Sequence, residues 1–377
     1  MGRPTVAEID LDALRFNAGQ VRELIKGQAK ILAVVKADAY GHGAGPVARE
    51  LESAGVSFFG VATGEEGMEL RQAGVSAPIL VLAGIDPKEL EWIIQNGLTP
   101  VLFDLDSARL LDRQAGNLRK NLTAHLKVDT GMSRLGIPWR EWKAAVDVFR
   151  SLANIKIEGL MSHLAVAESE KPEDRAFTEE QIRRFQACLD YVCKRGMQPR
   201  YIHLANSAGT TLWGKARFNL VRPGLMLYGV HPEPGLKRFI SLRPALCWKT
   251  EILSLKRVPA GDPVSYGRTY RCSKEKLICT LPVGYADGYS RCLSNRAEVL
   301  VRGRRAKVAG IVCMDLTMVD VSGIPGVQVG DEVVLLGKQG ADEISAAEMA
   351  EWMETIPYEV FCGIGKRVPR RHLRGKG

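Results

Sequence analysis

The stretch Ile31-Leu-Ala-Val-Val-Lys36-Ala-Asp-Ala-Tyr40-Gly-His-Gly43 contains the pattern that decides the fold of this chain. Five apolar residues without alternation are typical of a strand buried on both faces, as in a parallel sheet. Lys36 ends this strand, and a small-residue loop follows before a helical pattern that begins at Pro46. A lysine at the mouth of an apolar strand is partly desolvated, which favours the neutral amine needed for Schiff-base chemistry. The alternative interpretation is a strand-end lysine that extends into solvent.

The composition is ordinary for a globular protein, with 46% apolar and 25% charged residues in a chain of 377 residues. This length indicates about two domains. No apolar run approaches the roughly 20 residues of a membrane span, and the N-terminus lacks the apolar core of a signal peptide. We therefore expect a cytoplasmic protein that does not associate with membranes.

Eight cysteines are spread along the chain without a CxxC pair. This pattern predicts reduced thiols and argues against a disulfide framework or a zinc site, so no metal is expected. The net charge of +9 owes much to the basic segment Lys366–Lys376. No aromatic interleaving or nucleic-acid motif accompanies these charges, and we expect a solvated tail rather than a nucleic-acid-binding surface.

Seven further apolar runs follow the first, with helical patterns between them. Strands that alternate with helices predict parallel βαβ units, and eight of them in about 200 residues favour a closed (β/α)8 TIM-type barrel. A doubly wound sheet would carry a glycine-rich dinucleotide fingerprint after the first strand, which residues 41–46 do not match. The expected strands are 31–35, 58–62, 79–82, 100–103, 124–128, 157–161, 201–205 and 218–221.

The pattern changes near residue 237, where short strand-like runs replace the alternation of strands and helices. Gly-Asp turns at 261–262 and 330–331 separate some of these runs, which predicts a mostly antiparallel β domain. One helix is expected from Ser345 to Glu354, with Ser345 as its N-cap. The predicted fold is therefore an α/β barrel at 11–238 and a mostly β C-terminal domain at 239–377.

Active sites of barrels lie at the carboxyl ends of the strands. The seventh and eighth strands are followed by small residues, 206–209 and 222–225, where barrels commonly bind phosphate. A Schiff-base lysine on the first strand facing such a cradle indicates pyridoxal 5′-phosphate (PLP). Each residue alone could be a helix cap, a core imidazole or an ion-pair partner, and it is their joint placement that favours a site. The strand-end residues are Lys36, Thr63, Gly84, Asp104, Lys127, Asp129, His163, Asn206, Ser207 and Arg222.

The chain resembles the alanine racemases along essentially its whole length. The matching motifs lie at 33–43, 127–136, 203–207, 222–224, 264–267, 284–288, 313–315 and 357–360. The resemblance implies a PLP-dependent isomerase that interconverts L-alanine and D-alanine and supplies D-alanine for peptidoglycan. It also implies that the N-terminal strand, in residues 1–10, joins the C-terminal β domain.

The resemblance assigns two catalytic bases, Lys36 and Tyr266, to opposite faces of the substrate Cα, because racemisation removes a proton from one face and returns one to the other. Free tyrosine is a poor base at neutral pH, and the pair His163 and Arg222 would supply the positive charge that stabilises its phenolate. Arg222 would also donate to the cofactor ring nitrogen. Because arginine stays protonated, the ring nitrogen would stay neutral, which favours return of the proton to Cα.

The remaining roles are implied by the same resemblance. Arg134 and the Met314 backbone would bind the substrate carboxylate, and Lys127 matches a position that is a carbamate in many relatives, where it would orient Arg134. The implied protein is a homodimer in which Tyr266, Tyr285, Met314 and Asp315 enter the partner's barrel mouth. The implied cofactor-binding residues are Lys36, Tyr40, Asn206, Ser207, Arg222, Gly224, Leu225 and Tyr358.

Three alternatives remain open at this stage. A related PLP amino-acid decarboxylase would place an acid opposite the ring nitrogen, where this chain has Arg222. A non-catalytic PLP carrier of the single-barrel type would lack the β domain that carries Tyr266. A broad-specificity amino-acid racemase would share the same site, since Tyr285 and Tyr358 narrow the pocket without fixing which side chain it accepts.

Overall fold

The computed structural model describes residues 3–375. Residues 1, 2, 376 and 377, which belong to the predicted ranges 1–10 and 239–377, lie outside the described residues. The chain forms two compact units. The barrel unit comprises Leu14–Ala39 and Ala44–Arg243, and the β-rich unit comprises the chain up to Ala13, Tyr40–Gly43 and the chain from Pro244 onward.

The described part of the barrel unit contains a sheet of nine parallel strands, of which eight form the barrel predicted from the alternation of apolar runs and helical patterns. The order of hydrogen-bonded neighbours is β10-β2-β3-β4-β5-β6-β8-β9, and β7 (Ile137–Pro138) pairs with β6 outside this path. Just beyond β9 and β10, Arg222 N donates to Ala205 O at 2.9 Å, so the cylinder is nearly closed. The strands are β2 (Lys30–Val34), β3 (Phe58–Val61), β4 (Ile79–Val81), β5 (Leu98–Leu102), β6 (Leu122–Asp129), β8 (Ile155–Met161), β9 (Tyr201–His203) and β10 (Leu220–Val221).

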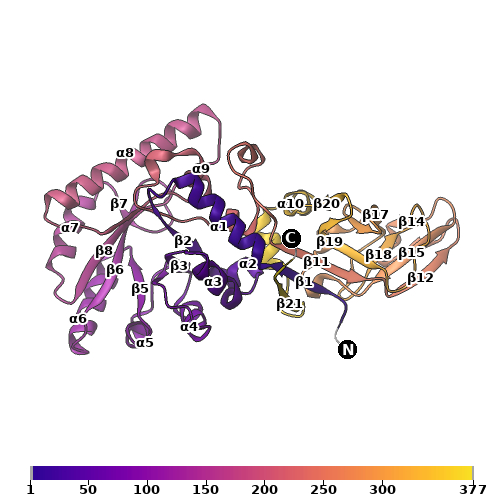
Figure 1. Ribbon diagram of the computed structural model, residues 1–377, viewed down its shortest axis with the longest axis horizontal. Coiled ribbons are helices and arrows are strands. Elements are labelled where there is room, and N and C mark those ends of the chain that lie inside the picture. The colour runs from indigo at the N-terminus through magenta and orange to yellow at the C-terminus, as the bar shows by residue number, and fades with distance from the viewer. Residues whose placement is uncertain (1–2, 376–377) are drawn as a thin grey trace. The chain divides into compact units, whose positions relative to one another are not determined.

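Helices connect the barrel strands, as Figure 1 shows for the indigo and magenta parts of the chain. Thr63 and Asp104, two of the strand-end residues, accept hydrogen bonds from Glu66 N and Ser107 N and act as N-caps of the next helix. Among the described residues, no helix has the length and apolar character of a membrane span. The helices are α1 (Leu11–Ile25), α3 (Ala44–Ser53), α4 (Gly64–Gln72), α5 (Leu90–Gln95), α6 (Leu105–Asn117), α7 (Trp142–Ser151), α8 (Pro172–Lys194) and α9 (Ser207–Leu212).

The segment after the first barrel strand differs from the prediction of a strand-end lysine and a loop. Lys36 lies beyond the end of β2 and begins α2 (Lys36–Gly41), and α3 begins at Ala44 rather than Pro46. The residues from Ala37 to Tyr40 have φ between +51° and +53°, so α2 is a left-handed turn. Four non-glycine residues in this region cost about 4–8 kcal/mol in total, and their contacts must offset this strain.

The β-rich unit contains a ten-stranded sheet with the order β12-β15-β18-β17-β16-β19-β11-β1-β21, to which β20 adds beside β19. It is antiparallel except for the pair β1 and β21, in agreement with the predicted β domain. Its strands are β1 (Val6–Asp10), β11 (Leu246–Glu251), β12 (Ser254–Val258), β15 (Lys276–Leu281), β16 (Glu298–Val301), β17 (Arg304–Val308), β18 (Thr317–Asp320), β19 (Glu332–Gln339), β20 (Asp342–Ile344) and β21 (Arg370–Leu373).

Among the described residues, two α-helices lie entirely within this unit, α10 (Ala346–Met353) and α11 (Pro357–Gly363). Ser345 caps α10 as predicted, since its hydroxyl accepts from Glu348 N at 3.1 Å. The Glu348 carboxylate binds Arg305 at 2.5 Å instead of closing a capping box.

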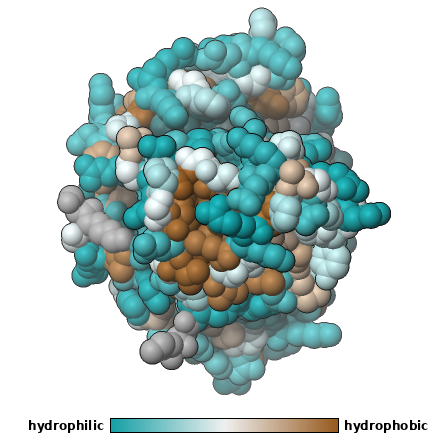
Figure 2. All heavy atoms as spheres, turned by 90° about the vertical axis from the view of Figure 1, so that its right-hand side faces the viewer, coloured by the Kyte–Doolittle hydropathy of each residue, from teal (hydrophilic) through white to brown (hydrophobic). Residues whose placement is uncertain are grey.

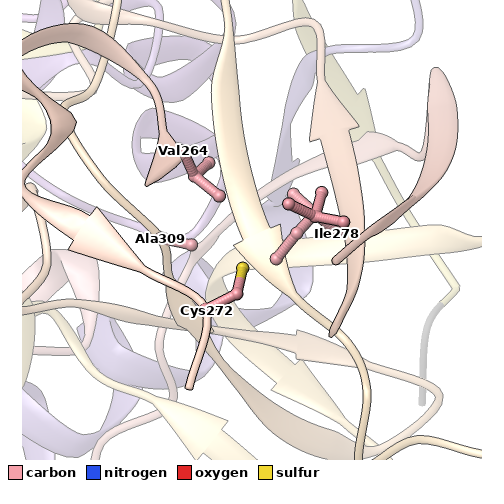
Figure 3. Packing of buried hydrophobic residues seen from close by; sticks show 5 residues of the cluster. Val264, Cys272, Ile278 and Ala309 are labelled. Atoms are coloured by element: carbon pink, nitrogen blue, oxygen red, sulfur yellow. The ribbon is translucent and has the colours of Figure 1, made fainter. Parts of the chain in front are cut away.

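A small hairpin of β13 (Pro263–Val264) and β14 (Tyr270–Arg271) brackets the turn that carries Tyr266. Buried side chains anchor it, and Figure 3 shows Val264 and Cys272 beside Ile278 of β15 and Ala309. On the side of this unit beyond β12 and β15, apolar side chains gather into a patch bordered by polar ones (Figure 2).

The basic C-terminal segment was expected to be a solvated tail, and this prediction is wrong for the part that forms β21. Residues Arg370–Leu373 pair in parallel with Ala7–Asp10 of β1. Charge alone misled the prediction, because backbone pairing and buried carbonyl acceptors hold the strand in place.

Candidate active site

The backbone around Lys36 is fixed by one glutamate of the barrel unit. Glu66 accepts from Ala37 N at 2.7 Å and from Ala62 N at 2.6 Å, and so ties the first residue after Lys36 to the end of β3. Asp38 in turn accepts from Ala44 N, the first residue of α3. Because each bond uses a carboxylate and a backbone amide, this segment is held by charge-assisted bonds on both sides.

Arg222 is a buried cation with neutral acceptors only. Its Nη atoms lie within hydrogen-bonding distance of the carbonyl oxygens of Ser162, His203 and Leu204, and of Nδ1 of His163 and His203. Burial lowers the pKa of Arg222 to about 9, so the guanidinium stays charged at neutral pH. Within the described residues no carboxylate contacts it, and its Nε has no partner, which leaves one donor available.

Arginine can only donate, and this fixes the proton positions on its histidine neighbours. His203 accepts at Nδ1 from Arg222 at 3.1 Å and therefore carries its proton on Nε2, which faces Nδ1 of His125 at 2.8 Å. Burial and the Arg222 charge lower the pKa of His125 to about 3 and that of His203 well below its usual value. Both rings are neutral, and the His125 Nε2 that ends this chain is buried without a partner in the described residues.

His163 is arranged in the same way. Its Nδ1 accepts from Arg222 at 3.2 Å, and burial followed by the Arg222 charge holds its pKa well below 6.5. The neutral ring therefore carries its proton on Nε2, as a donor directed away from Arg222.

Lys127 and Arg134 differ in exposure, although neither side chain has a hydrogen-bond or ion-pair partner among the described residues. Lys127 is only 6% exposed at the end of β6, and burial together with Arg222 and Arg134 lowers its pKa to about 8. Arg134 is exposed in the loop that follows β6. Nearby, Asp129 accepts from Gly131 N and Met132 N and so shapes this loop. An unpaired exposed arginine can bind an external carboxylate, and the neutral fraction of a buried lysine is nucleophilic.

The loops after β9 and β10 are joined by Ser207. Its Oγ accepts from Gly224 N at 2.9 Å, directly before Leu225, and Asn206 caps α9 by accepting from Gly209 N at 2.8 Å. The predicted phosphate cradle residues are therefore brought together, with Asn206 acting as the helix cap that orients Ser207.

The β-rich unit carries the other predicted site residues. Tyr266, Tyr285 and Met314 line one cavity of about 440 Å³, together with Arg291 and the chain from Ile311 to Cys313. Their exposed fractions are 72%, 43% and 53%, which is high for such large apolar side chains. Ser265, with φ of +65°, donates from Oγ to Ile311 O at 2.6 Å and so fixes the turn beneath Tyr266.

The turn that presents Tyr285 is locked to the segment that presents Met314. Tyr285 N donates to Cys313 O and Ala286 N to Met314 O, both at 3.0 Å. A Cβ on Gly284 would lie 2.2 Å from Cys313 O, so only glycine allows this approach. Asp315 follows Met314 and pairs with Arg367 at 2.7 Å.

Tyr40 and Tyr358 meet within the β-rich unit. Their ring centroids lie 5.5 Å apart in an edge-to-face arrangement, with Tyr40 at the end of the left-handed turn and Tyr358 in the first turn of α11. Burial, together with the neighbouring Tyr358, raises the pKa of Tyr40 above its ordinary value, so its hydroxyl stays protonated as a donor.

Sequence reasoning missed Glu66, His125 and the structural role of His203. Glu66 stands three residues after the N-cap Thr63, which is the signal of a capping box, but its carboxylate reaches Ala62 N and Ala37 N instead. His125 and His203 occupy apolar strand patterns and give no local signal, because their pairing depends on the register of three strands.

Comparison with known proteins covers nearly the whole chain. Residues 9–232 match the family model described as "Alanine racemase, N-terminal domain", and residues 245–372 match "Alanine racemase, C-terminal domain". A protein named alanine racemase from Halothermothrix orenii is 49% identical over 370 residues, covering 98% of this chain and 97% of that protein.

Solved structures agree with the sequence matches. The alanine racemase of Clostridium difficile 630 superimposes with a TM-score of 0.93 at 36% identity, over 100% of this chain and 97% of that chain. A structure of the same protein in complex with cycloserine gives a TM-score of 0.91 at 35% identity, with the same coverage. The resemblance drawn from the motifs is confirmed, and the chain belongs to the alanine racemase family.

Proposed function

We propose that this protein interconverts L-alanine and D-alanine with PLP as cofactor. The observation that carries the proposal is Arg222, a buried cation with neutral acceptors and one unused donor. Relatives and solved neighbours named alanine racemase support the substrate. The decarboxylase alternative needs an acid where this chain has Arg222, and so it loses its support.

The donor set of the chain fits PLP. Lys36 would form the Schiff base, and Arg222 Nε would donate to the ring nitrogen. Ser207, the backbone N–H groups of Gly224 and Leu225, and the hydroxyls of Tyr40 and Tyr358 suit a phosphate group, with Asn206 holding Ser207 in position. Bound PLP supplies an electron sink that stabilises negative charge at the substrate Cα.

Two side chains of the protein move the proton. Lys36 Nζ takes or returns it on one face of Cα, and the Tyr266 phenol oxygen does so on the other. The proton on His163 Nε2, placed there because Arg222 donates to Nδ1, is available to stabilise the Tyr266 phenolate. Tyr285 and Asp315 support this second face, and their backbones are joined through Cys313 and Met314.

The substrate carboxylate is bound by Arg134 and the Met314 N–H. Arg134 is exposed and lacks a partner in the described residues, which suits an external anion. Lys127 carries a carbamate in this proposal. Its pKa of about 8 leaves more neutral amine at physiological pH than an ordinary lysine has, and a carbamate would remove the repulsion between Lys127 and Arg134.

The wider assignments rest on the same family membership. The protein acts as a homodimer with shared sites, supported by the exposure of Tyr266, Tyr285 and Met314 and by the apolar patch in Figure 2. It supplies D-alanine for peptidoglycan in the cytoplasm, in keeping with eight cysteines that are all free in the described chain. The pairing of β1 with β11 and β21 supports a domain division into 1–10 with 239–377, and 11–238.

The test is an exchange assay in heavy water across a panel of L-amino acids. Alanine should acquire deuterium at Cα and racemise, while the Lys36→Ala variant should lose both reactions and the visible absorption of a bound cofactor. Exchange and racemisation of many amino acids at comparable rates would establish the broad-specificity alternative. Release of carbon dioxide, or an unchanged spectrum in Lys36→Ala, would refute the proposal.

A further inference from the structure

Arg370, the first residue of β21, donates to four backbone carbonyls of the β-rich unit. Its Nε donates to Gly41 O at 3.0 Å, and its Nη atoms donate to Gly365 O at 2.6 Å, Val368 O at 2.7 Å and Ile364 O at 2.5 Å. Gly41 is the last residue of the left-handed turn, and the other three carbonyls belong to the segment after α11. One guanidinium therefore joins the segment that follows Lys36 to the segment that follows Tyr358.

His372, two residues further along β21, makes a second connection to the same segment. Its Nε2 lies 2.8 Å from His42 O, and the buried His42 ring packs edge-on against Phe361 with centroids 4.9 Å apart. The contact is close, because a Cβ on Gly43 would lie 2.7 Å from His372 Nε2. A Cβ on Gly41 would lie 2.4 Å from Phe361 O. Strand β21 and α11 thus enclose residues 41–43 from two sides.

These contacts adjoin a strained backbone segment, residues 37–40, that needs surrounding contacts to keep its conformation. The residues from Ala37 to Tyr40 have positive φ, a conformation that non-glycine residues rarely adopt in succession. Strained backbone persists only where surrounding contacts determine it. Arg370 bonds to the carbonyl of Gly41, the last residue of this turn, and His372 to the carbonyl of His42, the first residue after it, where the chain could otherwise relax.

We propose that Arg370 is a positioning residue, assisted by His372, and that strand β21 sets the affinity for PLP by clamping the turn that follows Lys36. The inference rests on the proposed function, because it assumes that Lys36 and Tyr40 hold the cofactor. The basic segment at the end of the chain thereby gains a role as an internal clamp. A chain without the clamp must order residues 37–43 each time it binds PLP. Its apparent affinity is then the intrinsic affinity multiplied by the fraction of molecules in which these residues are already ordered.

The test compares full-length variants freed of cofactor. Arg370→Met should raise the PLP dissociation constant about 10- to 100-fold, the effect of losing hydrogen bonds from a charged donor. Arg370→Lys should recover part of the affinity, since one ammonium cannot reach four carbonyls in the planar arrangement of a guanidinium. His372→Ala removes one bond and should raise the constant about fivefold. Arg371→Met is the matched control, because Arg371 is exposed on the same strand, and it should change the constant less than about twofold.

A second measurement separates positioning from general loss of stability. Amide hydrogen exchange in the cofactor-free chain should quicken in residues 37–43 of Arg370→Met and His372→Ala, while the barrel strands keep wild-type protection. Equal PLP affinity and equal protection of 37–43 in wild type and Arg370→Met would overturn the clamp. So would exchange that quickens to the same extent throughout the chain.

The two failures can be told apart. If the wild type does not bind PLP at Lys36, the proposed function fails, and the exchange of residues 37–43 still reports on the contacts of Arg370. If the wild type binds PLP and Arg370→Met binds it equally well, only the clamp fails.

Discussion

Two groups of proposed site residues are held in opposite ways. In the barrel unit, Arg222 is buried and fixed by side-chain bonds to imidazoles and carbonyls. In the β-rich unit, Tyr266 and Tyr285 are exposed, and only the backbone of their turns is fixed. The first arrangement is complete within one chain, whereas the second leaves much of both tyrosine side chains uncovered. We therefore expect substitutions in the first region to affect folding and function together, and those in the second to affect function alone.

The largest expected effect comes from Tyr266→Phe. This change removes one oxygen from a side chain that is 72% exposed, so the fold should be unaffected. Loss of a general base typically costs about 10²–10⁴-fold, and racemisation should fall by that factor in both directions because the equilibrium constant between enantiomers is one. In heavy water, one enantiomer should still exchange its Cα proton with retention through Lys36, and the other should not. Equal loss of exchange for both enantiomers would contradict the two-base assignment.

The next prediction compares how much Arg222 and Tyr285 contribute to the free energy of unfolding. Arg222→Met leaves two imidazoles and three carbonyls without their donor, and should lower the free energy of unfolding by at least about 3 kcal/mol. Tyr285→Ala removes an exposed ring and should change it by less than about 0.5 kcal/mol. Urea unfolding of both variants beside the wild type measures the difference. A similar loss of unfolding free energy in the two variants would show that Tyr285 is packed within its own chain, contrary to the expectation that it is held only by the backbone of its turn.

The fold was predictable because its signals are local and repeated. Most barrel strands are short and largely apolar, and helical patterns separate them, so small errors at the ends did not accumulate. The left-handed turn after Lys36 was not predictable in this way, since aspartate adopts positive φ as a single residue and no local signal indicates a run of four non-glycine residues. Its conformation is imposed by groups distant in sequence, among them Glu66, which binds Ala37 N, and Arg370, which binds the carbonyl of Gly41 at the end of the turn.

The site was predictable in part. Residues at strand ends, such as Lys36, Lys127 and Arg222, follow from the rule that barrel sites lie at the carboxyl ends of strands. His125 could not be found, because a histidine within an apolar strand gains its meaning only when β6, β9 and β10 are placed in register. The exposure of Tyr266 was expected only from the family motif at 264–267, since the residue types around it do not by themselves indicate an uncovered side chain.

Lys127 gives a smaller effect that depends on pH. Its pKa is about 8 in the folded chain against 10.5 for an ordinary lysine, so between these values the unfolded chain binds more protons. The stability of the wild type relative to Lys127→Met should therefore rise with pH, by about 1.5 kcal/mol from pH 8 to 9.5. A carbamate does not titrate in this range, and bicarbonate should flatten the slope if Lys127 is carbamylated. A slope that bicarbonate leaves unchanged would count against the modification.

The last prediction concerns the activity recovered when a variant of the barrel unit and a variant of the β-rich unit are mixed. Lys36→Ala removes a proposed base of the barrel unit, and Tyr266→Phe removes the proposed base of the β-rich unit. Each variant alone should be nearly inactive.

If each site takes Lys36 from one subunit and Tyr266 from the other, half of the dimers in a refolded equal mixture are mixed. Each mixed dimer then has one intact site of its two, and about one quarter of the wild-type rate should return. A mixture that stays inactive, while size-exclusion chromatography of tagged chains shows mixed dimers, would mean that both residues serve the same chain. The exposure of Tyr266 would then need a different explanation, because a site completed within one chain gives no reason to leave 72% of a catalytic tyrosine uncovered.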